Sequence, residues 1–346
     1  MNKYDELYNF RIASRKDIDS IMLFLKTEWG ENHILANDKE FFIWQYGNEQ
    51  YGDHSTINFV LMEDKKGTLV GVNGFIPYAP AGKRRYVSSA ITKVKSDIKI
   101  PMAGIELIKR FKELVPADAY YSSGTNPKTM IPIGAKVFHY TTGILQQYYV
   151  LNPTRKEFKI AFLKEELLEK KMLKDIWKLR EILSFHEIKE HYDLQKQYAY
   201  QGYKSPEYIE KRYFQHPIYK YKAFGLYQEE QIEYSGILVA REIRVNDSKI
   251  LRFVDYLGEI RNLSGIGVSL QNLLIQSGYE YADFVVGSIE EELLEGSGFR
   301  LRKEEAIIPM YFDPFLRENI EIWYQKSKEE IVIFKADGDQ DRPNHR

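Results

Sequence analysis

The chain has 346 residues, of which 44% are hydrophobic and 29% are charged. This length favours two domains of about 150 residues each. The 49 Lys and Arg residues nearly balance the 50 Asp and Glu residues, so a net charge of -1 supplies no field that would attract nucleic acid. The absence of cysteine excludes disulfides and zinc sites with cysteine ligands, and it favours a reducing, cytoplasmic compartment.

No apolar run approaches the length of about 20 residues that spans a bilayer, so we expect neither a membrane span nor an export signal. Hydrophobic periodicity and turn residues then predict the elements of the first half in chain order. They are a strand at 10–13, a helix after Ser14, a short helix from Asp38, an antiparallel meander at 58–97, a helix from Pro101, and strands at 118–122, 136–140 and 144–150.

A similar order of elements recurs from about residue 205, which indicates a weak internal repeat. The expected elements are a helix that runs through Tyr208 and Ile209, strands at 222–227, 233–242 and 249–256, a helix at 265–276 and a strand at 281–286. Lys and Glu dominate residues 153–190, which predicts a solvated connector. We therefore expect an N-terminal domain at 1–152, a connector at 153–195, a C-terminal domain at 196–336 and a tail at 337–346.

The strongest local motif is a glycine-bearing turn between a strand and a helix. It consists of Asn262, Leu263, Ser264, Gly265, Ile266 and Gly267. Glycines let backbone amides approach a ligand, and a helix amino end favours an anion such as a pyrophosphate. The corresponding place in the first half runs from Lys99 to Gly104 and contains one glycine. A tight turn without a ligand is the alternative for both places.

This order of elements resembles, in both halves, the GNAT fold of acyl-CoA-dependent N-acetyltransferases. The implied fold class is α/β with a mixed sheet, as two tandem GNAT-like acyl-CoA N-acyltransferase domains. In that family the loop before the third helix carries Arg or Gln, two spacers, Gly, one spacer, and Gly or Ala, and it holds the pyrophosphate of acetyl-CoA. Asn262, Gly265 and Gly267 match that spacing, with Ile266 between the glycines. Lys99 and Gly104 match it in part.

The resemblance implies acetyl-CoA or another acyl-CoA as co-substrate, with the better motif in the second half. The family often carries an Asn after the fifth strand and a later Tyr that protonates the leaving thiolate of CoA. Asn126 fits the first role by position, whereas Tyr140 lies somewhat beyond the place of the second. The second half offers Gly298-Phe299 after its last helix but no such Tyr.

An acyl transfer to an amine also needs a base and a polarised carbonyl. His33 is the best base by residue type and place, because it lies between the first two helices, a region that lines the acceptor cleft in this fold. A histidine that caps or packs between helices is the alternative. Asp38 would orient His33 or bind the acceptor, or it simply caps a helix. His139 and Asp255 are second-tier candidates.

The whole chain further resembles a group of bacterial tandem GNAT-like proteins found with surface-polysaccharide biosynthesis. The segments that carry this likeness are 29–35, 38–45 and 308–315. It implies acyl transfer to the amino group of a sugar, including a nucleotide-linked sugar. Two alternatives stay open: a Fem-type aminoacyl transferase, which the neutral charge disfavours, and a degenerate binding or scaffold protein. A homodimer through an exposed strand is also open.

The tail at 337–344 carries acidic residues at alternate positions, which suggests a calcium loop. No glutamate follows at the twelfth position of such a loop, so we expect no metal site there. The remaining interpretations are a solvated tail and a lid over the acceptor site.

Overall fold

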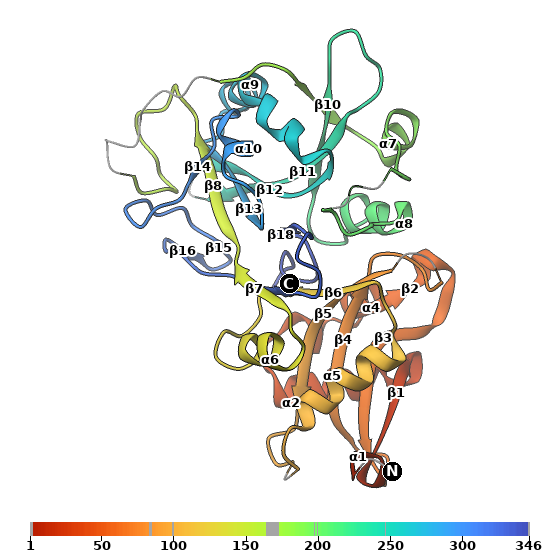
Figure 1. Cartoon of the computed structure of the whole chain (residues 1–346). Coiled ribbons are helices and arrows are strands. Elements are labelled where there is room, and N and C mark those ends of the chain that lie inside the picture. Colours follow the sequence, from red (N-terminus) through yellow and green to blue (C-terminus); the bar gives the residue numbers. More distant parts are fainter. Residues whose placement is uncertain are drawn as a thin grey trace.

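The computed structural model describes residues 3–82, 85–98, 100–163, 173–196, 198, 200–245 and 247–344. The chain forms two lobes, each built around a mixed sheet, and its C-terminal end lies between them (Figure 1). This arrangement confirms the expected α/β fold class.

The first sheet has the strand order β1-β3-β4-β5-β6-β17-β7, and the short strand β2 pairs with β3. β5 and β6 run parallel, and the other described pairs are antiparallel. The bounds are β1 Tyr8–Ser14, β2 Gly47–Asn48, β3 Asp53–Asp64, β4 Leu69–Pro77, β5 Tyr86–Val94, β6 Ala119–Ser123, β7 Thr141–Ile144 and β17 Trp323–Lys326. The expected meander at 58–97 is therefore confirmed as β3, β4 and β5.

The second sheet has the order β14-β8-β13-β12-β11-β10-β9, with β18 paired to β13. Here β12 and β13 are the parallel pair. The bounds are β8 Gln146–Leu151, β9 Lys178–Ile182, β10 Tyr221–Tyr227, β11 Gly236–Val245, β12 Ser248–Gly258, β13 Tyr281–Gly287, β14 Arg300–Leu301 and β18 Ile333–Phe334. β15 Tyr311–Phe312 and β16 Phe315–Leu316 form a separate hairpin.

Helices cover both faces of each sheet, as the alternation of apolar residues along the strands requires. On β3, Phe59 and Leu61 pack in the cluster that contains α2 and α4, whereas Val60 and Met62 face α5. The helices are α1 Lys3–Leu7, α2 Ile18–Glu28, α3 Ile34–Asn37, α4 Lys39–Tyr46, α5 Ala103–Leu114, α6 Met130–Val137, α7 Phe185–His191, α8 Pro206–Ile209, α9 Gly267–Ser277 and α10 Glu292–Glu295. Within the described ranges, none of them is long and apolar enough to cross a bilayer.

The two sheets exchange strands. β8 follows β7 in the chain but pairs with β13 of the second sheet, and β17 returns from the C-terminal half to lie between β6 and β7. The expected strand at 136–140 is wrong, because α6 continues to Val137. The expected strand at 144–150 exists as β8, in the other sheet. The domain boundary at 152 stays a prediction, and hydrogen-bonded strands cross it in both directions.

The expected connector at 153–195 is partly structured. It contains β9, the edge strand of the second sheet, and α7. Phe185 and Ile188 of α7 are buried against that sheet. This part of the connector therefore belongs to the second lobe. Residues 164–172 of the expected Lys-rich connector lie outside the described residues.

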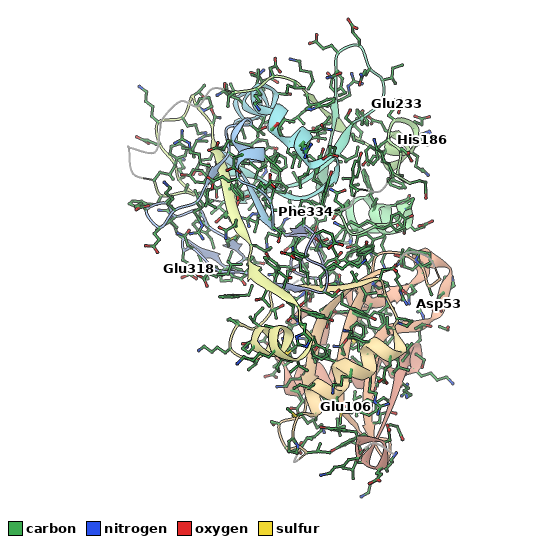
Figure 2. The ribbon with its side chains drawn as sticks, in the orientation of Figure 1. Asp53, Glu106, His186, Glu233, Glu318 and Phe334 are labelled. Atoms are coloured by element: carbon green, nitrogen blue, oxygen red, sulfur yellow. The ribbon has the colours of Figure 1, made fainter. Side chains whose placement is uncertain are left out.

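A buried ion cluster attaches the C-terminal segment to the second sheet. The ammonium of Lys204 lies 2.6 Å from an oxygen of Asp255 and 2.9 Å from one of Asp337, and all three side chains are buried. Tyr213 donates a further hydrogen bond to Asp255. The expectation of a solvated tail is therefore wrong at Asp337, where the tail begins. Phe334, three residues earlier, lies at the centre of the molecule (Figure 2).

Removing the cation of this cluster should destabilise the fold strongly. Lys204→Met leaves two buried carboxylates without a cation, and breaking such a pair costs about 3–5 kcal/mol. Burial already raises the pKa of Asp337. When the pKa of a carboxyl is raised in the folded state, the free energy of unfolding falls as the pH rises. The difference in unfolding free energy between Lys204→Met and the unmodified protein should therefore become smaller on acidification. Urea unfolding at two pH values measures both effects.

The matched control is Lys39→Met. Lys39 also lies 2.6 Å from a carboxylate, that of Asp19, but both side chains are exposed. Exposed pairs contribute at most about 1 kcal/mol. Equal losses in the two variants would contradict the structural role given to Lys204.

Candidate functional site

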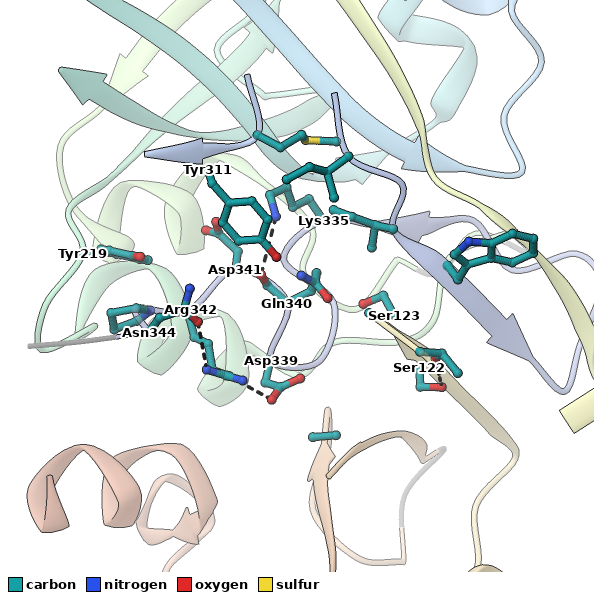
Figure 3. Close-up of a pocket in the computed structure, with 18 of the residues that line it drawn as sticks. Ser122, Ser123, Tyr219, Tyr311, Lys335, Asp339, Gln340, Asp341, Arg342 and Asn344 are labelled. Atoms are coloured by element: carbon teal, nitrogen blue, oxygen red, sulfur yellow. Dashed lines mark hydrogen bonds and ion pairs between the residues drawn. The ribbon is translucent and has the colours of Figure 1, made fainter. Parts of the chain in front are cut away.

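A large cleft lies between the two lobes, with a volume of about 1600 Å³. Its walls come from the ends of β5 and β6, from β10 and β11, from residues 310–313 and 320–325, and from the C-terminal residues 339–344 (Figure 3). Both sheets and the C-terminal segment therefore contribute to one cavity.

In the first lobe the parallel strands separate and form a V. β5 and β6 pair only from Tyr86 to Ser88 and from Ala119 to Tyr121. Beyond that point both strands line the cleft, through Ser89, Ala90, Thr92 and Lys93 of β5 and Ser122 and Ser123 of β6. We call this opening the first V.

The arm of the first V on β5 is fixed from its other side. The pairing of β4 with β5 has an irregularity between Gly74 and Phe75, which changes the direction of the strands. The amide of Asn73 then donates to the hydroxyl of Thr92 at 2.7 Å. The arm is therefore held rigidly although its β6-facing edge has no strand partner in the described part of the sheet.

In the second lobe the equivalent opening, the second V, is filled by the chain itself. β12 and β13 pair only from Leu251 to Phe253 and from Ala282 to Phe284. Beyond them β18 pairs with β13, the Lys335 amide donates to Val285 O at 3.1 Å, and the Ala336 amide donates to Val254 O at 2.9 Å. The C-terminal segment thus occupies the place between the strands.

The glycine motif of the second lobe is also covered by the chain. The amides of Ile176 and Trp177 both donate to Gly265 O, and the amide of Ile266 donates to the hydroxyl of Ser297. A Cβ on Gly265 would lie 2.8 Å from Ile176 and Trp177.

The other residues of this motif also have packing roles. A Cβ on Gly267 would lie 2.8 Å from Gly296 O, and Asn262 donates to Ser235 O. The glycines therefore serve close packing, and a pyrophosphate would have to displace residues 173–177.

The corresponding loop of the first lobe is open. Met102, at the place of the first family glycine, has φ 62°, a left-handed conformation that favours glycine. No described heavy atom lies within 4 Å of a Cβ built on Gly104. Lys99 lies outside the described residues. The first lobe thus keeps the turn geometry although the sequence motif is weaker there.

Solved structures with a similar fold exist. A GCN5-related N-acetyltransferase from Anabaena variabilis is 13% identical with a TM-score of 0.54, and the match covers 92% of this chain and 72% of that one. A protein from Enterococcus faecalis described as a probable N-acyltransferase is 9% identical with a TM-score of 0.52, over 92% and 72% of the two chains. The chain folds as two GNAT-like domains. No protein-family model and no curated protein matches its sequence.

His33 and Asp38 act as helix caps between the first helices of the N-terminal GNAT-like domain. The His33 Nδ1 accepts from the Leu35 amide at 3.2 Å, and an oxygen of Asp38 accepts from the Phe41 amide at 2.9 Å. His33 also lines a second cavity of about 560 Å³ that shares Trp29 and other residues with the cleft. The structure therefore places His33 beside the cleft and gives Asp38 a capping role.

The remaining predicted residues of the first GNAT-like domain separate. Asn126 lines the cleft, and its side chain accepts from the amides of Lys128 and Thr129. Tyr140 packs in the cluster around α5, with the Lys112 ammonium 5.1 Å from its ring centroid, and it is not among the described residues that line the cleft. This position gives no support to Tyr140 as a proton donor.

The tail lines the cleft, through residues 339–344, and the sequence analysis did not predict the ion pairs that hold it there. Asp341 is 2% exposed, and its oxygens lie 3.2 Å from Arg241 and 2.9 Å from the hydroxyl of Tyr221. Burial alone would raise the pKa of Asp341, but Arg241, Lys335 and Arg212 lower it to about 2. Among the described residues no group of His, Asp and Glu forms a metal site. Asp341 therefore anchors the tail to the cleft wall at Arg241.

Alanine substitutions test whether the glycine loop of the second lobe is packed and that of the first lobe is open. Gly265→Ala forces its Cβ against Ile176 and Trp177, and such overpacking costs about 1–3 kcal/mol. Gly104→Ala is the matched control, because alanine in α5 meets no described neighbour and stabilises a helix by about 0.5–1 kcal/mol over glycine. Thermal unfolding measures both, and a neutral Gly265→Ala would contradict the covered loop.

Proposed function

We propose that the chain is an acyl-CoA-dependent N-acyltransferase whose donor site is the first V. The observation that carries this proposal is the difference between the two openings. The first V opens into the cleft, whereas the second is filled by residues 333–336. The names of the two structural neighbours, an N-acetyltransferase and a probable N-acyltransferase, agree with this class of activity.

The donor would be acetyl-CoA or another acyl-CoA, bound in two places. The pyrophosphate would meet the amides at the start of α5, where the helix dipole and the left-handed Met102 favour an anion. The amide-containing pantetheine arm would lie along β5 beyond Ser88, where backbone groups face the cleft. Asn126, at the end of β6, is the polar side chain at the mouth of this path.

The acceptor would be the amino group of a sugar or nucleotide-linked sugar. Trp29, Tyr219, Tyr311 and Trp323 line the cleft, and aromatic rings give flat apolar surfaces on which a sugar ring packs. Polar groups of the tail lie among them (Figure 3). A role in surface-polysaccharide biosynthesis in the cytoplasm is the extension of this proposal that the sequence resemblance supports.

The chemistry is direct attack of the amine on the thioester carbonyl. A backbone amide of the β5 arm would polarise the carbonyl oxygen, and the closed walls of the cleft would limit access of water. Of the two glycine loops, the one at Gly104 would bind the donor. The other motif has a structural role instead; it consists of Asn262, Gly265, Ile266 and Gly267.

Calorimetric titration with acetyl-CoA and with free CoA tests the donor site. Gly104→Glu places a carboxylate at the start of α5, where it would repel a pyrophosphate, and we expect affinity to fall by at least about tenfold, or 1.4 kcal/mol. Ser20→Glu adds the same charge at an exposed site on α2 and should leave binding unchanged. Equal affinities of Gly104→Glu and Ser20→Glu would contradict a donor site at the start of α5.

A second variant tests the V itself. Ala90→Trp fills the arm of the first V with a bulky ring, and we expect it to abolish the rise in melting temperature that a bound CoA ester gives to the unmodified protein. Absence of any shift in the unmodified protein would overturn the proposed function and favour the scaffold or an aminoacyl-tRNA donor. If a CoA ester raises the melting temperature of Ala90→Trp as much as that of the unmodified protein, the donor binds elsewhere in the cleft.

A further inference from the structure

Lys335 presents a buried amine at the wall of the cleft. Its side chain is 6% exposed and lines the cavity. The Nζ atom donates to Gln340 O at 3.5 Å, a long hydrogen bond, and forms no ion pair with any carboxylate of the described ranges (Figure 3). Lysine is rarely buried without such a partner, so this residue calls for a physical explanation.

The backbone fixes this amine close to the first V. Lys335 follows β18 inside the second V, where its own amide donates to Val285 O. Two residues later, Asp337 O accepts a hydrogen bond from the hydroxyl of Ser123 at 3.0 Å. Ser123 lies on the β6 arm of the first V. The segment that carries the amine therefore touches the proposed donor site.

The charged groups around Lys335 belong to other pairs. Asp283 on β13 lies 2.6 Å from Arg252 on β12. Asp341 in the tail lies 3.2 Å from Arg241 on β11. Each carboxylate is thus paired with an arginine. Burial lowers the pKa of Lys335 to about 8, and Asp341 offsets only part of that effect. The amine is therefore partly neutral near physiological pH.

Lys326 shows what a fully satisfied buried lysine looks like in this chain. It is 1% exposed, and its ammonium donates to Ser288 Oγ, Glu329 O and Ile331 O at 2.6–2.7 Å. These three acceptors use all three protons of the ammonium. Lys326 thus has a structural role, and the single long bond of Lys335 leaves its nitrogen available to a ligand.

We propose that Lys335 is the base that accepts the proton of the attacking amine. This proposal rests on the proposed function. The acceptor nitrogen forms a C–N bond with the thioester carbonyl carbon, and one N–H proton passes to the neutral Lys335 nitrogen. The C–S bond then breaks, and the ammonium of Lys335 returns the proton to the CoA thiolate. Atoms and charge balance, and no further reactant is needed.

Competitive labelling with trinitrobenzenesulfonate tests the amine without any substrate. We expect the rate at Lys335, followed by peptide mass spectrometry, to rise with pH about a midpoint near 8. Lys109, exposed on α5, is the reference amine, labelled in the same reaction. Saturating CoA should slow labelling at Lys335 and leave Lys109 unchanged. A pH midpoint at Lys335 no lower than that measured at Lys109 would overturn the proposal.

Turnover tests the role in catalysis. With acetyl-CoA and glucosamine as probes, Lys335→Met should reduce the release of CoA thiol by at least about 100-fold, as expected for loss of a general base, with unchanged affinity for acetyl-CoA. The chain has no cysteine, so Lys335→Cys introduces a unique thiol. Alkylation with bromoethylamine turns it into a thioether lysine, which should restore transfer and shift the pH profile to lower pH.

These results separate the two proposals. If Lys335→Met binds acetyl-CoA and turns over at an undiminished rate, only the role of Lys335 is overturned. The same holds if alkylated Lys335→Cys regains activity without a change in the pH profile. Failure of the unmodified protein to bind acetyl-CoA or CoA would overturn the proposed function and the base role together.

Discussion

The ammonium of Lys204 lies between two buried carboxylates, Asp255 of the second sheet and Asp337 of the C-terminal segment. Charges so deeply buried are tolerated only when paired, so this contact fixes where the segment enters the interior. From Asp337 the chain reaches the hydroxyl of Ser123 in the first sheet, and it then follows the cleft to Asp341. The path of the C-terminal segment between the two lobes therefore depends on the cation that holds its start.

That segment makes two similar folds unequal. Each lobe has a parallel pair that separates after three residue pairs, and each therefore offers a V to a ligand. Residues 333–336 satisfy the backbone groups of the second V, and residues 173–177 cover its glycine loop. One lobe has thus closed its opening with its own chain. The other keeps an open arm on β5, so a single donor site is the arrangement that the packing favours.

Local patterns predicted the elements well, and long-range packing explains what they missed. The alternation in β3 to β5 and the apolar face of α5 are local, and they gave the meander and the helix. Strand exchange by β8 and β17 depends on partners far away in the chain, which periodicity does not encode. The motif at Gly265 and Gly267 was assigned to a ligand because glycine permits close approach of any backbone, and here the approaching backbone is that of Ile176 and Trp177.

The same limit applies to the tail, for which the sequence left a solvated segment and a lid over the acceptor site open. Its alternating aspartates have the pattern of a solvated or calcium-binding segment, and only the structure reveals their cationic partners, Lys204 for Asp337 and Arg241 for Asp341. With both carboxylates paired, Lys335, which lies two residues before Asp337, forms no ion pair with any carboxylate of the described residues. The segment that closes the second V thereby also carries a buried amine, held by one long hydrogen bond, to the wall of the cleft. Closure of the second V and the base that we propose for the cleft therefore come from the same packed segment, residues 333–341.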